Sequence, residues 1–368
     1  MSKMLPVDVL RLVDQFGRNY ESYKASKYNE TQLRREFLDP FFEALGWDVS
    51  NKKGIAEQYK EVIHEDAIKI NQSIKAPDYC FRVGSDRKFF VEAKKPSVNI
   101  REGVNPAYQL RRYAWSAKLP LSILTDFDEF AIYDCRVKPR PTDKASVGRI
   151  LYFKFDEIKD YWEEFSNVFS RDAVWQGSFD KYADDNSKKK GTSEVDNEFL
   201  KDLEIWREKL AKNIALRNKG ISTTELNFAV QRTLDRILFF RISEDRGIED
   251  VRKLSETLGA KEIYSLLCEM FKFADDKYNS GLFHFHKNND RPTPPDELSL
   301  SLKIDDKVLK EIIQGLYYPV CPYEFSVISV EILGQIYERF LGKEIQVTKG
   351  GKVNVVDKPL VKKAKGVF

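Results

Sequence analysis

The stretch KAPDYCFRVGSDRKFFVEAKKP, residues 75–96, contains two short apolar runs that each end in charged residues. PDYCFRV and RKFFVEAK are rich in β-branched and aromatic residues, and the GSD between them is typical of a turn, which predicts a β-hairpin. Side chains alternate across a strand, so Glu92 and Lys94 point to the same face. The hairpin also brings Asp78 close to Glu92. A packed strand therefore carries charges that a core normally excludes.

A divalent cation would explain these charges. Two carboxylates this close, with no arginine paired between them, repel each other unless a cation lies there. Mg²⁺ accepts one or two carboxylates, a backbone carbonyl and water, which predicts a site made by Asp78, Glu92 and the carbonyl of Ala93. Lys94 could then stabilise or deprotonate a water that attacks phosphorus. The alternative is a solvated hairpin with a surface ion pair.

Two neighbouring segments favour the site. Gln109 and Tyr113 in QLRRY lie four residues apart on one face of the next predicted helix. In the helix predicted over residues 29–46, Glu30 falls on the apolar stripe, whereas Glu36 falls on the opposite side. Glu30 is therefore the expected third carboxylate near the metal, and a salt-bridged Glu36 is the alternative.

The chain divides into segments of different character. Residues 1–178 alternate helical and strand patterns, which predicts an α/β domain with a mixed sheet flanked by helices. Residues 179–195 are polar and charged and indicate a linker. Residues 196–345 show helical periodicity, which predicts an all-α domain. Residues 346–368 are rich in Gly and Lys and are interpreted as a loop-like tail.

Composition sets broad limits. The 368 residues suffice for two domains with their own cores, and the net charge of +3 neither demands nor excludes nucleic acid, because a basic cleft can lie within a neutral total. No signal peptide and no apolar run of about 18 residues is present. The four cysteines are far apart. These features predict a soluble cytoplasmic protein with reduced thiols.

Several motifs together carry a family resemblance. Pro77-Asp78, thirteen residues and then Glu92-Ala93-Lys94 form the pattern of PD-(D/E)-x-K nucleases. With NETQLRREFLDPFFEALGWDV, NPAYQLRRYAW and LTDFDEFAIYD, the first half resembles the nuclease domain of type IIG restriction–modification enzymes and of type I restriction motor subunits. In the second half, LDRILFFRISEDRGI and LGQIYERFLGKEI resemble the helical connector that joins the nuclease to the methyltransferase in these enzymes.

The resemblance implies a restriction-endonuclease-like fold and a Mg²⁺-dependent, site-specific DNA endonuclease that leaves a 5′-phosphate, with Mn²⁺ able to replace Mg²⁺. It places Glu30, Asp78 and Glu92 at the metal. Gln109 and Tyr113 would position DNA or the lysine. The implied catalytic set is Asp78, Glu92, Lys94, Glu30, Gln109 and Tyr113.

The expected partner is double-stranded DNA, whose phosphates Lys95, Arg111 and Arg112 would contact. No Asn-Pro-Pro-Tyr, Asp-Pro-Pro-Tyr or Gly-rich cofactor motif is present. The resemblance therefore implies an N-terminal fragment without the methyltransferase and target-recognition domains. S-adenosylmethionine would serve only the absent adenine-N6 methyltransferase. One site cuts one strand, so double-strand cleavage implies a transient dimer.

Two other functions fit parts of the pattern. A repair or recombination nuclease acting on branched or single-stranded DNA would keep the fold, but the restriction-type connector argues against it. A non-catalytic DNA-binding module would have a degenerate site, but intact Asp78, Glu92 and Lys94 argue against that.

Overall fold

The computed structural model describes residues 4–25, 27–64, 77–185, 194–250, 252–278, 280–287, 294–348 and 353–358. The chain forms two compact units, Met1–Val195 and Asp196–Phe368. Within the described ranges, no helix combines the length and the apolar composition that crossing a bilayer requires.

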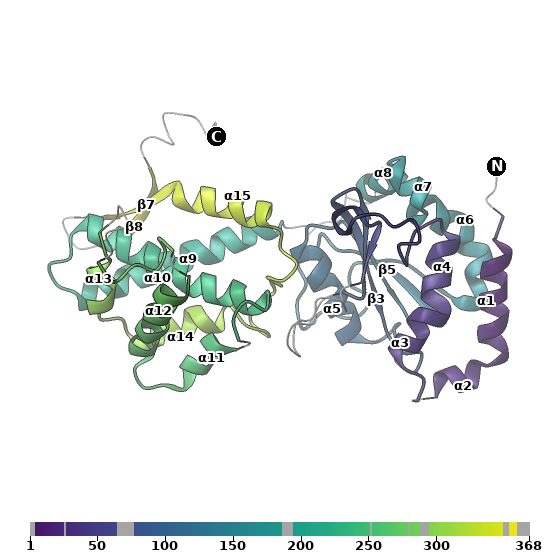
Figure 1. Ribbon diagram of the computed structural model, residues 1–368, viewed down its shortest axis with the longest axis horizontal. Helices are drawn as coiled ribbons and strands as arrows, with labels where there is room; N and C mark the ends of the chain where they lie inside the picture. Colours follow the sequence, from purple (N-terminus) through teal and green to yellow (C-terminus); the bar gives the residue numbers. More distant parts are fainter. Residues whose placement is uncertain are drawn as a thin grey trace. The chain divides into compact units, whose positions relative to one another are not determined.

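Unit 1 is built on a six-stranded sheet with the order β1-β2-β3-β4-β5-β6 (Figure 1). The strands are β1 (Val62–Ile63), β2 (Tyr79–Val83), β3 (Asp86–Ala93), β4 (Leu121–Thr125), β5 (Glu129–Asp134) and β6 (Arg149–Lys154). β3 and β4 run parallel, and the other neighbouring strands of this sheet are antiparallel. The predicted mixed sheet and its β2–β3 hairpin are confirmed.

Helices cover both faces of this sheet. They are α1 (Val7–Arg18), α2 (Tyr20–Lys24), α3 (Glu30–Leu33), α4 (Asp39–Ala44), α5 (Val104–Ser116), α6 (Ile158–Phe169), α7 (Arg171–Trp175) and α8 (Ser178–Asp185). α5 packs against β3 and β4 on one face, whereas α1, α4 and α6 lie on the other (Figure 1). Val91 and Ala93 of β3 belong to the core shared with α1, α4 and α6. The alternation of strand side chains therefore turns Glu92 toward α5.

The helix predicted over residues 29–46 begins and ends as expected, but it is irregular in between. Asn29 caps it, because the Asn29 side chain accepts from Gln32 N at 2.9 Å and Gln32 Oε1 accepts from Asn29 N at 3.1 Å. Gly46, with a φ of 92°, follows its end. The π-helical turn η1 (Arg34–Leu38) separates α3 from α4, whose second residue is Pro40. Such turns are frequent at functional sites.

Two expectations for unit 1 differ from the structure. The sequence EQYKEVIHE, residues 57–65, is predicted to form a strand. In the structure, Glu57–Tyr59 forms a 3-10 turn, η2, and the strand among the described residues of this segment is β1. The predicted linker, 179–195, begins inside α8, because Phe179 packs against Phe89 and Phe169 in the core. A second 3-10 turn, η4 (Phe155–Glu157), precedes α6. Residues 186–193 of the predicted linker lie outside the described residues.

Unit 2 is mainly helical (Figure 1). Its elements are α9 (Val195–Arg217), α10 (Thr223–Asp245), α11 (Lys253–Glu256), η5 (Thr257–Gly259), α12 (Ile263–Tyr278), α13 (Glu297–Ser301), α14 (Asp306–Gln314), α15 (Val330–Leu341), β7 (Lys343–Val347) and β8 (Val353–Asp357). The periodic segments predicted as helices form α9, α10, α12 and α15.

The expectation of an all-α unit with a loop-like tail is wrong in one respect, because β7 and β8 pair as a two-stranded antiparallel sheet. Asn227 of α10 fixes β7, since its side chain donates to Ile345 O and accepts from Ile345 N, both at 2.7 Å. These tertiary contacts stabilise strands in a polar segment whose composition favours a loop.

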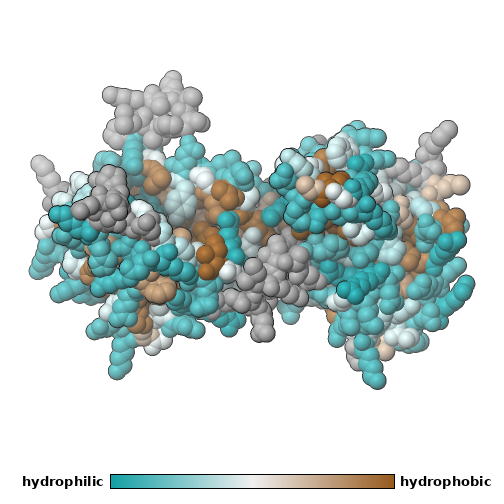
Figure 2. All heavy atoms as spheres, viewed as in Figure 1, coloured by the Kyte–Doolittle hydropathy of each residue, from teal (hydrophilic) through white to brown (hydrophobic). Residues whose placement is uncertain are grey.

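Figure 2 shows a mostly hydrophilic face on each unit, as the 32% charged residues of the chain lead one to expect. Charged side chains are seldom fully buried unless they are paired. Glu92 is 2% exposed, so its two carboxylate oxygens need partners within the protein.

Candidate active site

The β2–β3 hairpin brings two carboxylates together. Tyr79 of β2 pairs with Val91 of β3, which puts Asp78, one residue before β2, beside Glu92. Asp78 Oδ2 accepts a hydrogen bond from the backbone N–H of Ala93 at 2.8 Å. This bond fixes the Asp78 carboxylate at the end of the strand that carries Glu92 and Ala93.

The two oxygens of Glu92 have different surroundings. Oε1 accepts from Lys94 Nζ at 2.5 Å and from Gln109 Nε2 at 2.7 Å. Gln109 also donates to the hydroxyl of the buried Tyr113 at 3.3 Å. Oε2 is buried and has no hydrogen-bond partner among the described residues. A buried carboxylate oxygen without a donor is costly, so this atom requires a partner.

The electrostatics of the site are dominated by burial and by excess negative charge. The pKa of Glu92 is raised to about 8, mainly by burial and then by the charges of Asp78 and Glu30, while Lys94 opposes the change. Burial by itself would lower the pKa of Lys94, but Glu92, Glu30 and Asp78 outweigh it and raise that pKa. The ammonium group of Lys94 is therefore retained at neutral pH.

Arg34 is a site residue that the sequence interpretation missed. It lies in η1, and its Nη1 donates to Asp78 Oδ1 at 3.1 Å, while its Nη2 donates to Asp78 O at 3.3 Å and lies 3.1 Å from His64 Nδ1. The assumption that no arginine pairs with these carboxylates is therefore wrong. The signal was available, because Glu30 and Arg34 have the i, i+4 spacing that puts two side chains on one helix face.

The two candidate carboxylates of the first helical segment lie in different surroundings. Glu30 is half-buried, and its charge contributes to the raised pKa of both Glu92 and Lys94. Glu36 is exposed and accepts from the hydroxyl of Tyr28 at 3.1 Å. Glu30, and not Glu36, is therefore the first-helix carboxylate whose charge acts on Glu92 and Lys94.

The three cations expected to contact DNA are placed differently from one another. Lys95 is exposed and directly follows the Glu92–Lys94 segment. Arg111 is 1% exposed, and its Nη1 donates to Asp143 Oδ2 at 2.9 Å, so it cannot reach a phosphate and the expectation for Arg111 is corrected. Arg112 is half-buried on α5.

The acidic residues fit a cation site in which a backbone carbonyl and water molecules supply the remaining ligands. Within the part of the chain that the structure describes, no three Asp, Glu, His or Cys side chains are grouped as a complete metal site. Mg²⁺ does not need such a set, since one or two carboxylates, a carbonyl and waters suffice. The unpartnered Glu92 Oε2 beside Asp78 fits this type of ligation.

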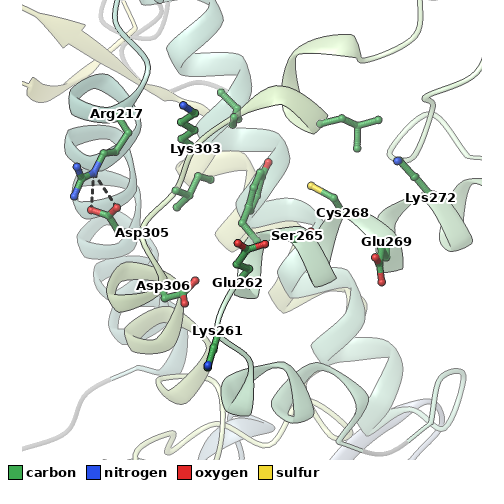
Figure 3. A pocket seen from close by; sticks show the side chains of 14 residues that line it. Arg217, Lys261, Glu262, Ser265, Cys268, Glu269, Lys272, Lys303, Asp305 and Asp306 are labelled. Atoms are coloured by element: carbon green, nitrogen blue, oxygen red, sulfur yellow. Dashed lines mark hydrogen bonds and ion pairs between the residues drawn. The ribbon is translucent and has the colours of Figure 1, made fainter.

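A pocket of about 720 Å³ lies in unit 2 (Figure 3). Its lining contains as many carboxylates as cations, and among them Arg217 Nε is paired with Asp305 Oδ1 at 2.8 Å. The charges balance, and none of the predicted site residues lies there. We therefore assign the candidate active site to the hairpin of unit 1.

Comparisons with known proteins agree with the motifs. No family model matches the chain, and no solved structure matches it. The chain is 38% identical over 350 residues to the type II restriction enzyme and methyltransferase RM.Eco57I of Escherichia coli. The match covers 95% of this chain but 34% of that protein, so the chain spans about a third of the length of this relative. This similarity confirms the resemblance to type II restriction–modification enzymes that the sequence motifs indicated.

Proposed function

We propose that this chain is a Mg²⁺-dependent DNA endonuclease of the PD-(D/E)-x-K type and the nuclease part of a restriction–modification enzyme. The observation that carries the proposal is the convergence of Asp78, Glu92 and Lys94 at the ends of two adjacent strands, with Glu92 Oε2 buried and unpartnered among the described residues. The similarity to RM.Eco57I, a restriction enzyme and methyltransferase, supports DNA as the substrate.

The chain's own residues would divide the work as follows. Asp78, Glu92 Oε2 and the carbonyl of Ala93 would hold Mg²⁺. The negative charge of Glu30, which already acts on Glu92, would add to the attraction for the cation. When bound, Mg²⁺ would acidify a water molecule and neutralise charge on the phosphate. Lys94, kept protonated by its carboxylate neighbours, would stabilise negative charge on the phosphate oxygens.

Two further residues would hold these groups in place. Gln109 donates to Glu92 Oε1, which would leave Oε2 for the cation. Arg34 binds both the side chain and the carbonyl of Asp78, which orients that carboxylate before Mg²⁺ enters. Both act through a ligand rather than on DNA.

The proposal is tested by incubating the full chain with plasmid DNA in Mg²⁺ and following nicking and linearisation. Asp78→Asn and Lys94→Met should each reduce cleavage by at least about 100-fold, because each removes charge that acts on the reacting phosphate. Asp86→Asn is the matched control, since Asp86 is an exposed aspartate on the same hairpin. Cleavage by either site variant at the parent rate, with melting temperatures unchanged, would refute the assignment. Linear duplex, branched and single-stranded substrates run in parallel distinguish a restriction nuclease from a repair nuclease.

A further inference from the structure

The loop Lys95–Glu102, between the Glu92–Lys94 segment and α5, has an unusual distribution of side chains. Pro96 and Ile100 are buried, and the loop exposes side chains that can donate hydrogen bonds. These exposed donors are Lys95, Ser97, Asn99 and Arg101. We call this segment the anchored loop. Such a row of donors is suited to phosphate oxygens rather than to an apolar partner.

Three side chains from other elements hold the backbone of the anchored loop. Lys24 Nζ, at the end of α2, donates to Pro96 O at 2.7 Å. Glu129 Oε2, on β5, accepts from Ile100 N at 2.9 Å. Arg149 Nη1, on β6, donates to Arg101 O at 2.7 Å. A loop that is already ordered loses less conformational entropy on binding than a mobile one.

The anchors are themselves supported by buried groups. Lys24 forms an ion pair with Asp128, whose side chain is 3% exposed. Glu129 accepts from the hydroxyl of Tyr152. The guanidinium groups of Arg101 and Arg149 lie 5.4 Å and 5.2 Å from the centroid of the Tyr152 ring. The Tyr152 side chain thus contacts the anchor Glu129 through its hydroxyl and lies under Arg101 and Arg149.

The cations around these two guanidinium groups outnumber the neighbouring carboxylates by one. The ion pair of Arg101 is with Glu102, at 4.0 Å, and the Arg101 side chain is 62% exposed. No ion pair of Arg149 or Lys95 with a described residue is found. Lys95, Arg101 and Arg149 against Glu102 and Glu129 give a local charge of +1 (three cations and two anions) next to the end of β3. An anion bound there would be attracted to both guanidinium groups.

From this geometry we infer that the anchored loop binds the DNA backbone beside the phosphate that is cut, with Lys95 and Arg101 as phosphate contacts. The inference rests on the proposed function and adds a surface to it. Glu129 acts as a positioning residue, because it touches the loop backbone and not DNA. Arg149 both anchors the loop and adds positive charge.

Binding of a fluorescent duplex to the full chain, measured by anisotropy from about 50 to 200 mM salt, tests this inference. Lys95→Ala and Arg101→Ala should each weaken binding by about 3- to 10-fold and reduce the slope of log K against log salt by about 0.9, the value for one lost phosphate contact. Arg11→Ala is the matched control, because Arg11 is an exposed arginine on α1. It should leave both quantities unchanged.

A positioning role for Glu129 has a different signature. Glu129→Leu removes the carboxylate oxygen that accepts from Ile100 N and should weaken binding without reducing the salt slope, since no phosphate contact is lost. A slope reduced as much as in Arg101→Ala would contradict that role.

The results separate the two proposals. If the parent chain binds DNA and both loop variants match it in affinity and slope, the anchored loop is not the DNA surface and the nuclease assignment stands. If the parent chain neither binds nor cuts duplex DNA in Mg²⁺, the proposed function fails and this inference fails with it.

Discussion

Replacing Glu92 by glutamine should stabilise the metal-free chain and at the same time abolish DNA cleavage. Glutamine has nearly the shape of glutamate and keeps an oxygen that can accept from Lys94 and Gln109. It removes the negative charge that burial and the neighbouring Asp78 make unfavourable. A core glutamate that serves only stability would give the opposite result, because its loss would weaken the fold.

The size of the effect follows from the pKa of Glu92, which is raised from 4.5 to about 8. A raised acid pKa means that the folded state binds the proton more tightly, so stability is present below about pH 4.5 and is lost as pH rises toward 8. At about pH 7.5 the penalty is at most about 4 kcal/mol, from about 1.4 kcal/mol per pH unit. The Lys94 ammonium loses its ion pair in the variant, which offsets part of this gain. We therefore expect a net stabilisation of about 2 kcal/mol, or about 4–8 °C in Tm.

Thermal unfolding of both proteins in EDTA, from about pH 5 to pH 8, measures this stabilisation. The difference in Tm should increase with pH, and Mg²⁺ should raise the Tm of the parent but not of Glu92→Gln. Glu21→Gln, an exposed glutamate on α2, is the control for the substitution itself. A Glu92→Gln variant that is less stable than the parent at every pH and still responds to Mg²⁺ would refute the reasoning.

Arg34→Ala should lower the free energy of unfolding in urea by about 3 kcal/mol, because it leaves Asp78 without its largely buried cation; a loss below about 1 kcal/mol would show that solvent screens the pair. Gln109→Leu should reduce kcat for cleavage by about 10-fold with little change in KM, because Gln109 orients Glu92 without touching DNA; a change confined to KM would contradict this role. In unit 2, burial raises the pKa of Asp235 to about 6. Protonation of Asp235 between about pH 7.5 and pH 4 should therefore contribute about 2 kcal/mol to the free energy of unfolding of the parent. Asp235→Asn should lack that gain in pH-dependent urea unfolding, and equal pH profiles would overturn the prediction.

Local patterns predicted the hairpin and the helix beside it. The alternation in RKFFVEAK was enough to turn Glu92 away from the core that Val91 joins, and the i, i+4 spacing of Gln109 and Tyr113 predicted their shared face. The Asn29 cap was equally local, since the residues that form it are three apart. Short-range geometry of this type depends on the backbone period alone.

Contacts between distant segments were not predictable in this way. The i, i+4 spacing puts Arg34 on the helix face of Glu30, but its partner Asp78 lies 44 residues away, and Asp143 lies 32 residues from Arg111, so no periodic pattern predicts either pair. The strand β7 depends on Asn227, which precedes Ile345 by 118 residues. In each of these cases a polar side chain binds a partner that is distant in the sequence and close only in the tertiary structure.

Crystals of the chain grown with Mn²⁺ and measured at the manganese absorption edge would test the cation site most directly. We predict an anomalous peak for a manganese ion that is bound by Asp78 and by Glu92 Oε2, with Lys94 still donating to Glu92 Oε1. A map at saturating Mn²⁺ that has no peak between these two carboxylates would contradict the metal-dependent mechanism.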